Sequence, residues 1–462
     1  MKNNRWSSAF QNVEVELELN IESKNIIGEI PSNLNGTLYR IGPAFFGYNQ
    51  ELVNHWFDGD GMVVSINIKD KKVFFRNKFV KTKGYLEEKK EKKSLYRGVF
   101  GSKKTDSSLK NFWKLKNVSN TNIFFFNNKL LSLWEAGLPY HLDALSLETL
   151  SIENFNNQLN ESDFFSAHPK YDPFNQKIIT FSSKPGMIKS ILKIMEIDSN
   201  NIINSYSIDL KGFLFVHDFA ITKEYYIFYQ APISFNPVPY IIGLKGVGQC
   251  IKKKEMKIGT FVLINKITNK ITSIPGNNEF IFHHVNAYQK DKNIYIDSVY
   301  YSDLEILNME FNDPKPLKNK PMLKRCILNI ESKKSTFDNY TNDAMEFGTV
   351  HPNYYGKLNK YIWLACLNNK NQEYFNCIRR INISSYKIKD CNFSENHYIG
   401  EPIFVSKNNN NELAGFILTM VWDGENKISY LSIIDAEEMI EICKIILPII
   451  IPHQIHGFWH CF

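Results

Sequence analysis

Four histidines with similar neighbours lie far apart along the chain, and their side chains are of a type that binds metal ions. Each stands beside apolar or small residues, and the set comprises His168, His217, His283 and His456. Dozens of residues separate each histidine from the next, so no single helix or hairpin makes them neighbours. They can meet only if each lies at the end of a different group of strands around one axis. The alternative is that they are ordinary histidines at strand ends.

The chemistry of these side chains narrows the choice of metal. Imidazole suits zinc, copper, iron and nickel. Closed zinc sites usually include thiolates, and the seven cysteines of the chain form no Cys-x-x-Cys pair. Four neutral imidazoles that leave coordination positions open suit Fe(II), which can bind O₂ at the free positions. The set therefore favours a ferrous site.

Three glutamates stand inside hydrophobic runs, at Glu135, Glu346 and Glu401. A metal-binding histidine usually donates its second ring N–H to a carboxylate, which fixes the orientation of the ring. A buried carboxylate also needs partners of its own. The three glutamates are therefore candidates to hold the histidines, and the alternative is that they are surface residues of strands.

The elements that would position these residues are short strands. Apolar or alternating runs are separated by Asn, Lys, Gly and Asp turns at Lys72–Phe75, Asn122–Phe126, Leu130–Trp134, Ile178–Phe181, Tyr225–Tyr229, Phe261–Ile264, Ile294–Val299, Tyr361–Leu367, Phe416–Trp422 and Tyr430–Ile434. Many short strands with turn residues between them indicate an all-β fold. Over residues 1–462, one propeller domain of about seven four-stranded blades is the simplest fit, without a WD or kelch repeat.

A few segments depart from the strand pattern. Met187–Met195 has helical spacing, and Glu87–Lys93 is expected to be a charged loop. Asn408–Asn411 is expected to be a polar tip. Two Asp-Gly pairs at Asp58 and Asp60 predict tight turns with positive φ. A calcium-binding loop is excluded there, because the series of carboxylates that ends in a glutamate is missing.

Composition sets further bounds. The chain is 43% hydrophobic and 22% charged with a net charge of +7, but no nucleic-acid-binding signature accompanies the charge, and we expect no nucleic acid partner. Cysteines without a pairing framework indicate a reducing compartment. From the polar start of the sequence we expect no signal peptide, and the longest apolar run, Ile445–Pro452, is far short of the ~20 residues of a spanning helix. We expect a cytoplasmic monomer, soluble or peripheral on a membrane.

Seven motifs in order along nearly the whole chain resemble the carotenoid cleavage oxygenase family, which includes apocarotenoid oxygenases, stilbene cleavage dioxygenases and the retinoid isomerase of the eye. They are Gly36–Pro43, His55–Met62, Ala167–Pro173, His217–Thr222, Phe282–Tyr288, Gly400–Val405 and His456–Trp459. The resemblance implies a seven-bladed β-propeller with a helical and loop cap over the axis that carries the metal.

The same resemblance implies roles for the residues above. Fe(II) would be held by His168, His217, His283 and His456, while the nearby His284, His453 and His460 are left out. Glu135, Glu346 and Glu401 would hold His217, His283 and His456 respectively, and His168 would have no carboxylate. Thr121 matches a position that limits access to a vacant coordination site. Two departures, His453-Gln454-Ile455 and Glu346-Phe347-Gly348-Thr349, concern local loop shape.

The implied activity is a dioxygenase reaction in which O₂ splits one C=C bond of a carotenoid or apocarotenoid into two carbonyl products. Stilbene-cleaving members carry a lysine at the position of Trp134, and without this cation a stilbene substrate is less favoured. The alternative is that Trp134 is a packed strand residue. A propeller hydrolase would show more carboxylate ligands, and a non-catalytic binding propeller would not need the histidines.

An apolar polyene substrate also suggests contact with a membrane. Ala231–Leu244 is the most apolar loop-like stretch, and Lys252–Lys254 follow it. Together with Met187–Met195, this pattern is typical of an interfacial anchor. The alternative is a buried cap over the substrate tunnel.

Overall fold

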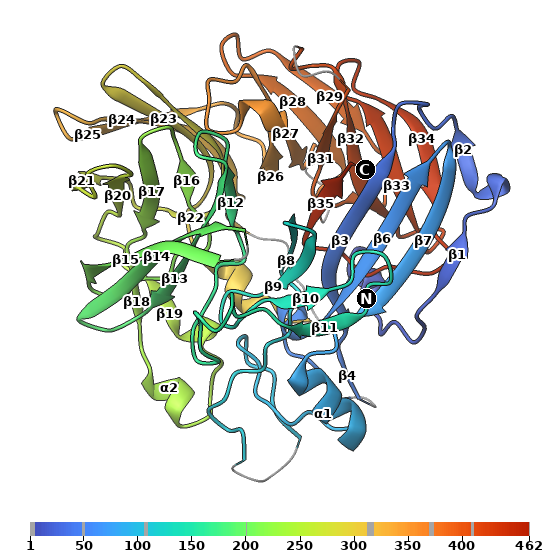
Figure 1. The fold of residues 1–462 in the computed structure, drawn as a ribbon, viewed down its shortest axis with the longest axis horizontal. Coiled ribbons are helices and arrows are strands. Elements are labelled where there is room, and N and C mark those ends of the chain that lie inside the picture. The colour runs from blue at the N-terminus through green and yellow to red at the C-terminus, as the bar shows by residue number, and fades with distance from the viewer. Residues whose placement is uncertain are drawn as a thin grey trace.

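Strands dominate the computed structural model, which describes residues 5–48, 51–105, 110–199, 201–311, 318–368, 374–407 and 411–461. Seven antiparallel sheets of four or more strands surround a central axis, as Figure 1 shows. The prediction of an all-β, seven-bladed propeller is confirmed.

The blades follow one another along the chain. Blade one has the order β1 (Glu18–Asn20), β7 (Lys72–Phe79), β6 (Asp60–Lys69), β3 (Gly36–Phe45) and β35 (His456–His460). Blade two has β11 (Thr149–Ile152), β10 (Tyr140–Leu142), β9 (Lys129–Leu133) and β8 (Asn122–Phe126). Blade three has β15 (Asn201–Lys211), β14 (Lys189–Asp198), β13 (Lys177–Lys184) and β12 (Lys170–Asp172). Blade four has β21 (Ile271–Pro275), β20 (Thr260–Asn265), β17 (Tyr225–Gln230) and β16 (Ala220–Ile221).

The remaining blades complete the ring. Blade five has β25 (Lys334–Asn339), β24 (Met322–Asn329), β23 (Asn293–Tyr301) and β22 (Phe280–Lys290). Blade six has β29 (Ile388–Asn392), β28 (Cys377–Asn382), β27 (Tyr361–Cys366) and β26 (Met345–Thr349). Blade seven has β2 (Ile26–Gly28), β34 (Ile440–Ile446), β33 (Ile428–Asp435), β32 (Gly415–Asp423), β30 (His397–Ile399) and β31 (Ile403–Ser406), which also pairs with β32.

Two pairings between distant parts of the chain close the ring. The late strand β35 pairs antiparallel with β3, with Ile41 opposite His456. The early strand β2 pairs with the outer strand β34, with Gly28 opposite Cys443. Blades one and seven therefore each contain a strand from the other end of the chain, and hydrogen bonds hold the circle together at its inner and outer edges.

Smaller elements lie outside the blades. The two-stranded pairs are β4 (Gly47–Tyr48) with β5 (Glu51–Leu52) and β18 (Ile233–Phe235) with β19 (Ile251–Lys253). The helices α1 (Lys83–Glu91) and α2 (Val238–Ile241) lie on the same side of the molecule, at the lower edge of Figure 1. No helix of the described ranges is long and apolar enough to cross a bilayer.

Two local expectations are wrong, and a third falls mostly outside the described residues. Met187–Met195 is not helical, because Leu192 and Ile194 alternate with more exposed residues and β14 pairs on both sides with β13 and β15. The Glu87–Lys93 loop is largely part of α1, whose first turn is capped when Tyr85 N–H donates to Thr82 Oγ1 at 3.1 Å. Of Asn408–Asn411, residues 408–410 lie outside the described residues.

The Asp-Gly pairs do not form positive-φ turns either. Gly59 has a φ of −71°, and Asp60-Gly61 opens strand β6. A glycine is needed at Gly61 for a different reason, because a Cβ there would collide with the carbonyl oxygen of Ser119. The glycine allows this strand to approach the loop before β8.

Candidate metal centre

The four histidines converge on the axis. His168 and His217 lie in the loops directly before β12 and β16, His283 lies on β22, and His456 begins β35. One ligand nitrogen from each lies within 4.8 Å of those of the other three. Four separate blades therefore contribute one imidazole each, and each histidine stands at or near an innermost strand.

Three of the rings are held by the three glutamates. His217 Nδ1 lies 2.9 Å from Glu135 Oε2. His283 Nδ1 lies 2.8 Å from Glu346 Oε2, and His456 Nδ1 lies 2.8 Å from Glu401 Oε1. A proton on Nδ1 that is donated to the carboxylate leaves Nε2 with a free lone pair. Each ring is therefore held in the tautomer that a metal requires.

The three glutamates differ in their own support. Glu346 accepts hydrogen bonds from the Tyr301 hydroxyl at 2.8 Å and from the Phe347 N–H at 2.5 Å. Glu401 accepts one from the Gly457 N–H at 2.9 Å and pairs with Arg40. The Glu135 side chain is 30% exposed. Glu346 and Glu401 are therefore held firmly, whereas Glu135 borders a more open space.

His168 differs from the other three. Among the described residues no carboxylate contacts its ring, and its backbone N–H donates to Ser166 Oγ at 3.0 Å. Its Nε2 lies 2.9 Å from His217 Nε2. Burial lowers the pKa of His168 well below its ordinary value, and the neighbouring imidazoles lower this pKa further. His168 is therefore held neutral, with its ring nitrogen available to a cation.

Charge also distinguishes His283. Burial alone would lower the pKa of this imidazole, but the Glu346 carboxylate outweighs burial and raises it. The same interaction keeps the pKa of Glu346 below its ordinary value despite burial. The ionised carboxylate favours positive charge on the ring, and a metal cation at Nε2 would supply that charge in place of a proton.

The donor set fits a metal ion. The Nε2 atoms of His283 and His456 are buried, and neither finds a hydrogen-bond partner in the described part of the chain. Such orphaned nitrogens are costly unless something occupies their lone pairs. Four inward-facing imidazole nitrogens without thiolate or carboxylate ligands could hold a metal ion such as Fe(II) and leave coordination positions free.

The sequence did not identify two residues that support this centre. Arg40 on β3 is 1% exposed, and its Nη1 lies 2.8 Å from Glu401 Oε2. Tyr301 at the end of β23 donates to Glu346. The glycine at position 457 is an indirect sign of the buried Arg40, because a Cβ on Gly457 would collide with the Arg40 side chain that crosses it. Both residues act on the histidines through a glutamate.

The two departures from the family pattern lie beside the centre. Phe347 has a φ of 57°, and the register of β26 against β27 shifts between Glu346 and Thr349. Gly348 follows because a Cβ would collide with Val285. His453 Nε2 lies 2.9 Å from the Trp6 carbonyl oxygen, and burial lowers its pKa to about 4. His453 is thus a packing residue that fixes the N-terminal segment.

Other predicted residues are placed as follows. His284 points away from the cluster, and its Nδ1 lies 2.7 Å from Ser298 Oγ. His460 packs at 4.0 Å from the ring of Phe125.

Thr121 donates its backbone N–H to the Leu133 carbonyl at 3.1 Å, and its neighbour Asn122 donates to the carbonyl of Ala167, which precedes His168. Thr121 therefore stands at the loop that carries the first histidine.

Comparisons with known proteins agree with this arrangement. Residues 10–460 match the family model described as retinal pigment epithelial membrane protein. The apocarotenoid-15,15'-oxygenase of Synechocystis is 32% identical, over 98% of this chain and 96% of that protein. The carotenoid 9,10(9',10')-cleavage dioxygenase of Crocus sativus is 26% identical, over 94% of this chain and 84% of that protein.

Solved structures show the same fold. The cobalt-substituted Synechocystis apocarotenoid oxygenase superposes with a TM-score of 0.93 at 31% identity, and the match covers 99% of this chain and 98% of that one. Agreement over the whole length, in both sequence and structure, shows that the chain belongs to the retinal pigment epithelial membrane protein family, which is the family of the carotenoid cleavage oxygenases.

Proposed function

We propose that the protein is an Fe(II)-dependent dioxygenase that uses O₂ to cleave a C=C bond of a carotenoid or apocarotenoid into two carbonyl products. The observation that carries the proposal is the convergence of four imidazole nitrogens within 4.8 Å. Its support also includes the similarity to an apocarotenoid oxygenase over nearly the whole chain. Four nitrogen ligands and free positions match the requirements of ferrous oxygen chemistry.

The residues of the chain position the reactants. His168, His217, His283 and His456 would hold the iron, which when bound supplies the capacity to activate O₂. Glu135, Glu346 and Glu401 fix three of the rings, so that the ligand geometry exists before substrate binds. Thr121 would restrict access to one coordination position. Neither a protein nucleophile nor a general base is required of the surrounding residues.

The substrate class is supported by Trp134. This side chain is 8% exposed and precedes Glu135, the partner of His217. An aromatic surface at this position favours an extended apolar chain, and it offers no cation to a phenol. A carotenoid-type substrate is therefore favoured over a stilbene.

Metal analysis combined with product analysis tests the proposal. Protein purified without oxygen should contain about one iron per chain. Incubation with O₂ and a panel of carotenoids, apocarotenals and stilbenes should give paired carbonyl products from a polyene. Zinc or calcium with hydrolytic products would point instead to a hydrolase. The absence of any bound metal would point to a non-catalytic propeller.

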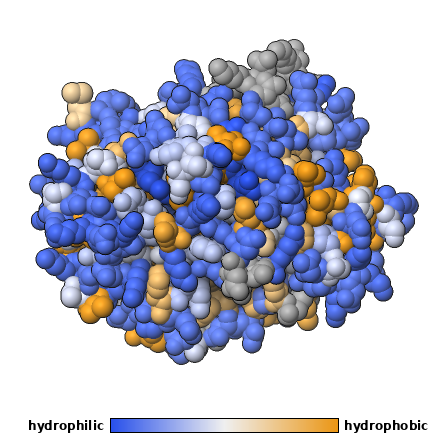
Figure 2. Space-filling model, turned by 90° about the horizontal axis from the view of Figure 1, so that it is seen from above, coloured by the Kyte–Doolittle hydropathy of each residue, from blue (hydrophilic) through white to orange (hydrophobic). Residues whose placement is uncertain are grey.

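We also propose that the enzyme contacts a membrane through α2 and the residues that follow it. Val238, Ile241, Ile242 and Leu244 are 53–75% exposed. The exposed Lys252 and Lys254 lie close by in the chain, and Arg97 holds the segment by donating to the carbonyls of Tyr240 and Lys245. The opposite side of the molecule, seen in Figure 2, is mainly hydrophilic with scattered apolar residues. Apolar side chains beside lysines suit an anionic bilayer surface.

Two substitutions in this segment should weaken membrane binding. Burying Ile242 and Leu244 in the interface is worth roughly 1.5–3 kcal/mol each, so Ile242→Asp with Leu244→Asp should reduce sedimentation with anionic vesicles by at least ~100-fold. Ile267→Asp is the matched control, because Ile267 is 86% exposed in the turn between β20 and β21. Equal sedimentation of both variants and the parent protein would refute the membrane role of α2.

A further inference from the structure

The carboxylate of Asp218 connects chain segments that carry histidines of the metal centre. Asp218 directly follows His217 in the loop before β16, and its side chain is only 2% exposed. One of its oxygens, Oδ1, lies 2.8 Å from Nζ of Lys170, the first residue of β12. Lys170 is the second residue after His168. A buried ion pair therefore joins the segment of His168 in blade three to the segment of His217 in blade four.

The other oxygen of Asp218 reaches blade five. Oδ2 accepts a hydrogen bond from the backbone N–H of His284 at 2.9 Å, and His284 directly follows His283 on β22. Strand β22 is the innermost strand of its blade, so one of its edges has no neighbouring strand in the sheet. A buried backbone N–H without a strand partner needs another acceptor, and here the acceptor belongs to a neighbouring blade. Three of the four histidine segments thus meet at one carboxylate.

Two further contacts hold the Asp218 bridge, which consists of Asp218, Lys170 and the backbone N–H of His284. The backbone N–H of Phe219 donates to Asp218 Oδ1 at 2.8 Å. The Lys170 ammonium lies 5.8 Å from the centre of the Tyr355 ring, which is a cation–π distance. Both oxygens of the buried carboxylate therefore have donors, as a buried charge requires, and the side chain has little freedom to rotate.

The Asp218 bridge differs in its action from the glutamates of the centre. Glu135, Glu346 and Glu401 each contact the ring of one histidine and fix its direction. The bridge contacts no ring of the cluster and fixes the distances between backbones instead. It also reaches the segment of His168, whose ring no described carboxylate contacts. Four nitrogens can stay within 4.8 Å of one another only if both direction and distance are held.

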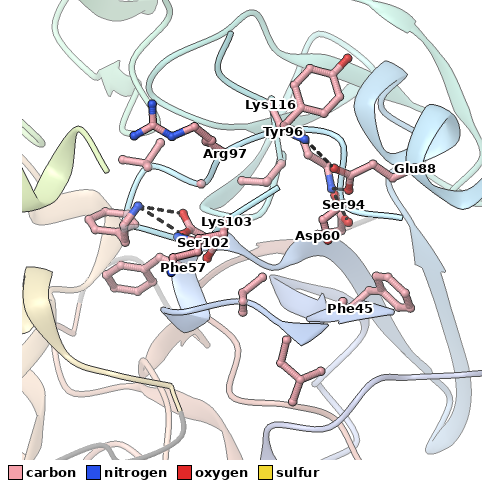
Figure 3. A pocket seen from close by; sticks show the side chains of 18 of the residues that line it. Phe45, Phe57, Asp60, Glu88, Ser94, Tyr96, Arg97, Ser102, Lys103 and Lys116 are labelled. Atoms are coloured by element: carbon pink, nitrogen blue, oxygen red, sulfur yellow. Dashed lines mark hydrogen bonds and ion pairs between the residues drawn. The ribbon is translucent and has the colours of Figure 1, made fainter. Parts of the chain in front are cut away.

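A buried lysine also pairs with carboxylates where it joins no histidine segment. Lys116 Nζ lies 2.7 Å from Asp60 Oδ2 and 2.5 Å from Glu88 Oε2. Figure 3 shows these three side chains gathered on one side of a pocket, and the described residues that line this pocket include none of the four histidines. Such a group can serve the fold alone, so it is the position between three histidine segments that sets the Asp218 bridge apart.

We propose that Asp218 is a positioning residue that sets the spacing of three metal-binding imidazoles through their backbones. The three imidazoles belong to His168, His217 and His283. The inference rests on the metal ion of the proposed function and is independent of the substrate. Without the bridge, the three segments can move apart, and the metal meets a ligand set whose spacing no longer fits it.

Asp218→Asn tests the proposal with almost no change of shape. An asparagine has one acceptor oxygen and one NH₂ donor group, so either Lys170 or the His284 N–H then faces a donor. The proteins are loaded with Co(II), because its visible absorption depends on coordination geometry. In competition with a chelator, Asp218→Asn should bind Co(II) ~10-fold or more weakly than the parent protein. The visible spectrum of the bound Co(II) should change as well.

A second buried pair between the same two blades provides the matched control. Asp172 Oδ2 on β12 lies 2.6 Å from Nζ of Lys266, which follows β20, and the two side chains are 0% and 4% exposed. The Asp172 carboxylate also binds Phe174 N–H and the Asn175 side chain, both in its own turn. Asp172→Asn should therefore destabilise the fold as Asp218→Asn does, while the affinity and spectrum of Co(II) in the folded protein stay unchanged.

Each outcome bears on the bridge. Unchanged affinity and spectrum in folded Asp218→Asn overturn the positioning role and leave the proposed function standing, and so do equal changes in Asp172→Asn. If Asp218→Asn does not fold, Lys170→Met combined with Asp218→Asn leaves no buried charge unpaired and carries the same expectation. A parent protein that binds neither Co(II) nor Fe(II) would refute the proposed function together with this inference.

Discussion

Replacing His283 with alanine should leave the purified protein almost without iron and without cleavage activity. His283 supplies one of four nitrogens within 4.8 Å of one another, and its loss also removes one of the hydrogen-bond partners of Glu346. The loss of a ligand should cost more affinity than the ~10–100-fold that follows loss of a partner of a ligand. Metal content after anaerobic loading and dialysis, with product formation from an apocarotenal, measures both effects.

Two further variants provide reference values of metal affinity for this experiment. Glu346→Gln keeps the imidazole and removes only the charge beside it, so metal affinity should fall by ~10–100-fold. His141→Ala changes a histidine on β10 outside the cluster and should retain iron and activity. If His283→Ala binds iron as tightly as the parent protein does, the four histidines are not the ligand set.

Replacing Arg40 with methionine should lower the free energy of unfolding by about 3–5 kcal/mol. The substitution leaves the Glu401 carboxylate buried without its cation, whose Nη1 lies 2.8 Å away in the parent protein. Because Glu401 orients His456, metal affinity should fall as well. Urea unfolding followed by tryptophan fluorescence gives the first quantity, and competition with a chelator gives the second.

A buried pair elsewhere in the fold provides the control. Arg325 Nη2 lies 2.7 Å from Asp297 Oδ2 in blade five, and neither residue touches a glutamate that holds a histidine. Arg325→Met should destabilise the fold to a similar degree and leave the metal affinity of the folded protein unchanged. A loss of stability below about 0.5 kcal/mol for Arg40→Met, the range of ordinary surface changes, would contradict the role of Arg40.

The convergence of the histidines could be predicted because the strands are identifiable from local sequence patterns, namely the spacing of apolar residues and the turn residues between them. The runs at Asn122–Phe126 and Tyr225–Tyr229 correspond closely to β8 and β17. Once the strands form a ring, each histidine falls near an inner strand. The glutamates could be assigned by family resemblance, which contains the pairing information that a single sequence lacks.

The predictions that were wrong, and the residues that were missed, depended on contacts between distant segments of the chain. Met187–Met195 has spacing compatible with a helix, and its pairing with β13 and β15 decides otherwise. Arg40 and Glu401 lie 361 residues apart in the sequence, and neither carries a local sign that it needs the other.

The pairing of β35 with β3 has a consequence for biosynthesis. His456 is the first residue of the strand that joins the late part of the chain to blade one. A ribosome must therefore translate past this strand before the circle can close, and the fourth nitrogen becomes available at the same moment. A chain that terminates before residue 456 lacks both the closing strand and the fourth ligand nitrogen. The complete metal site therefore forms only when the ring of blades is complete.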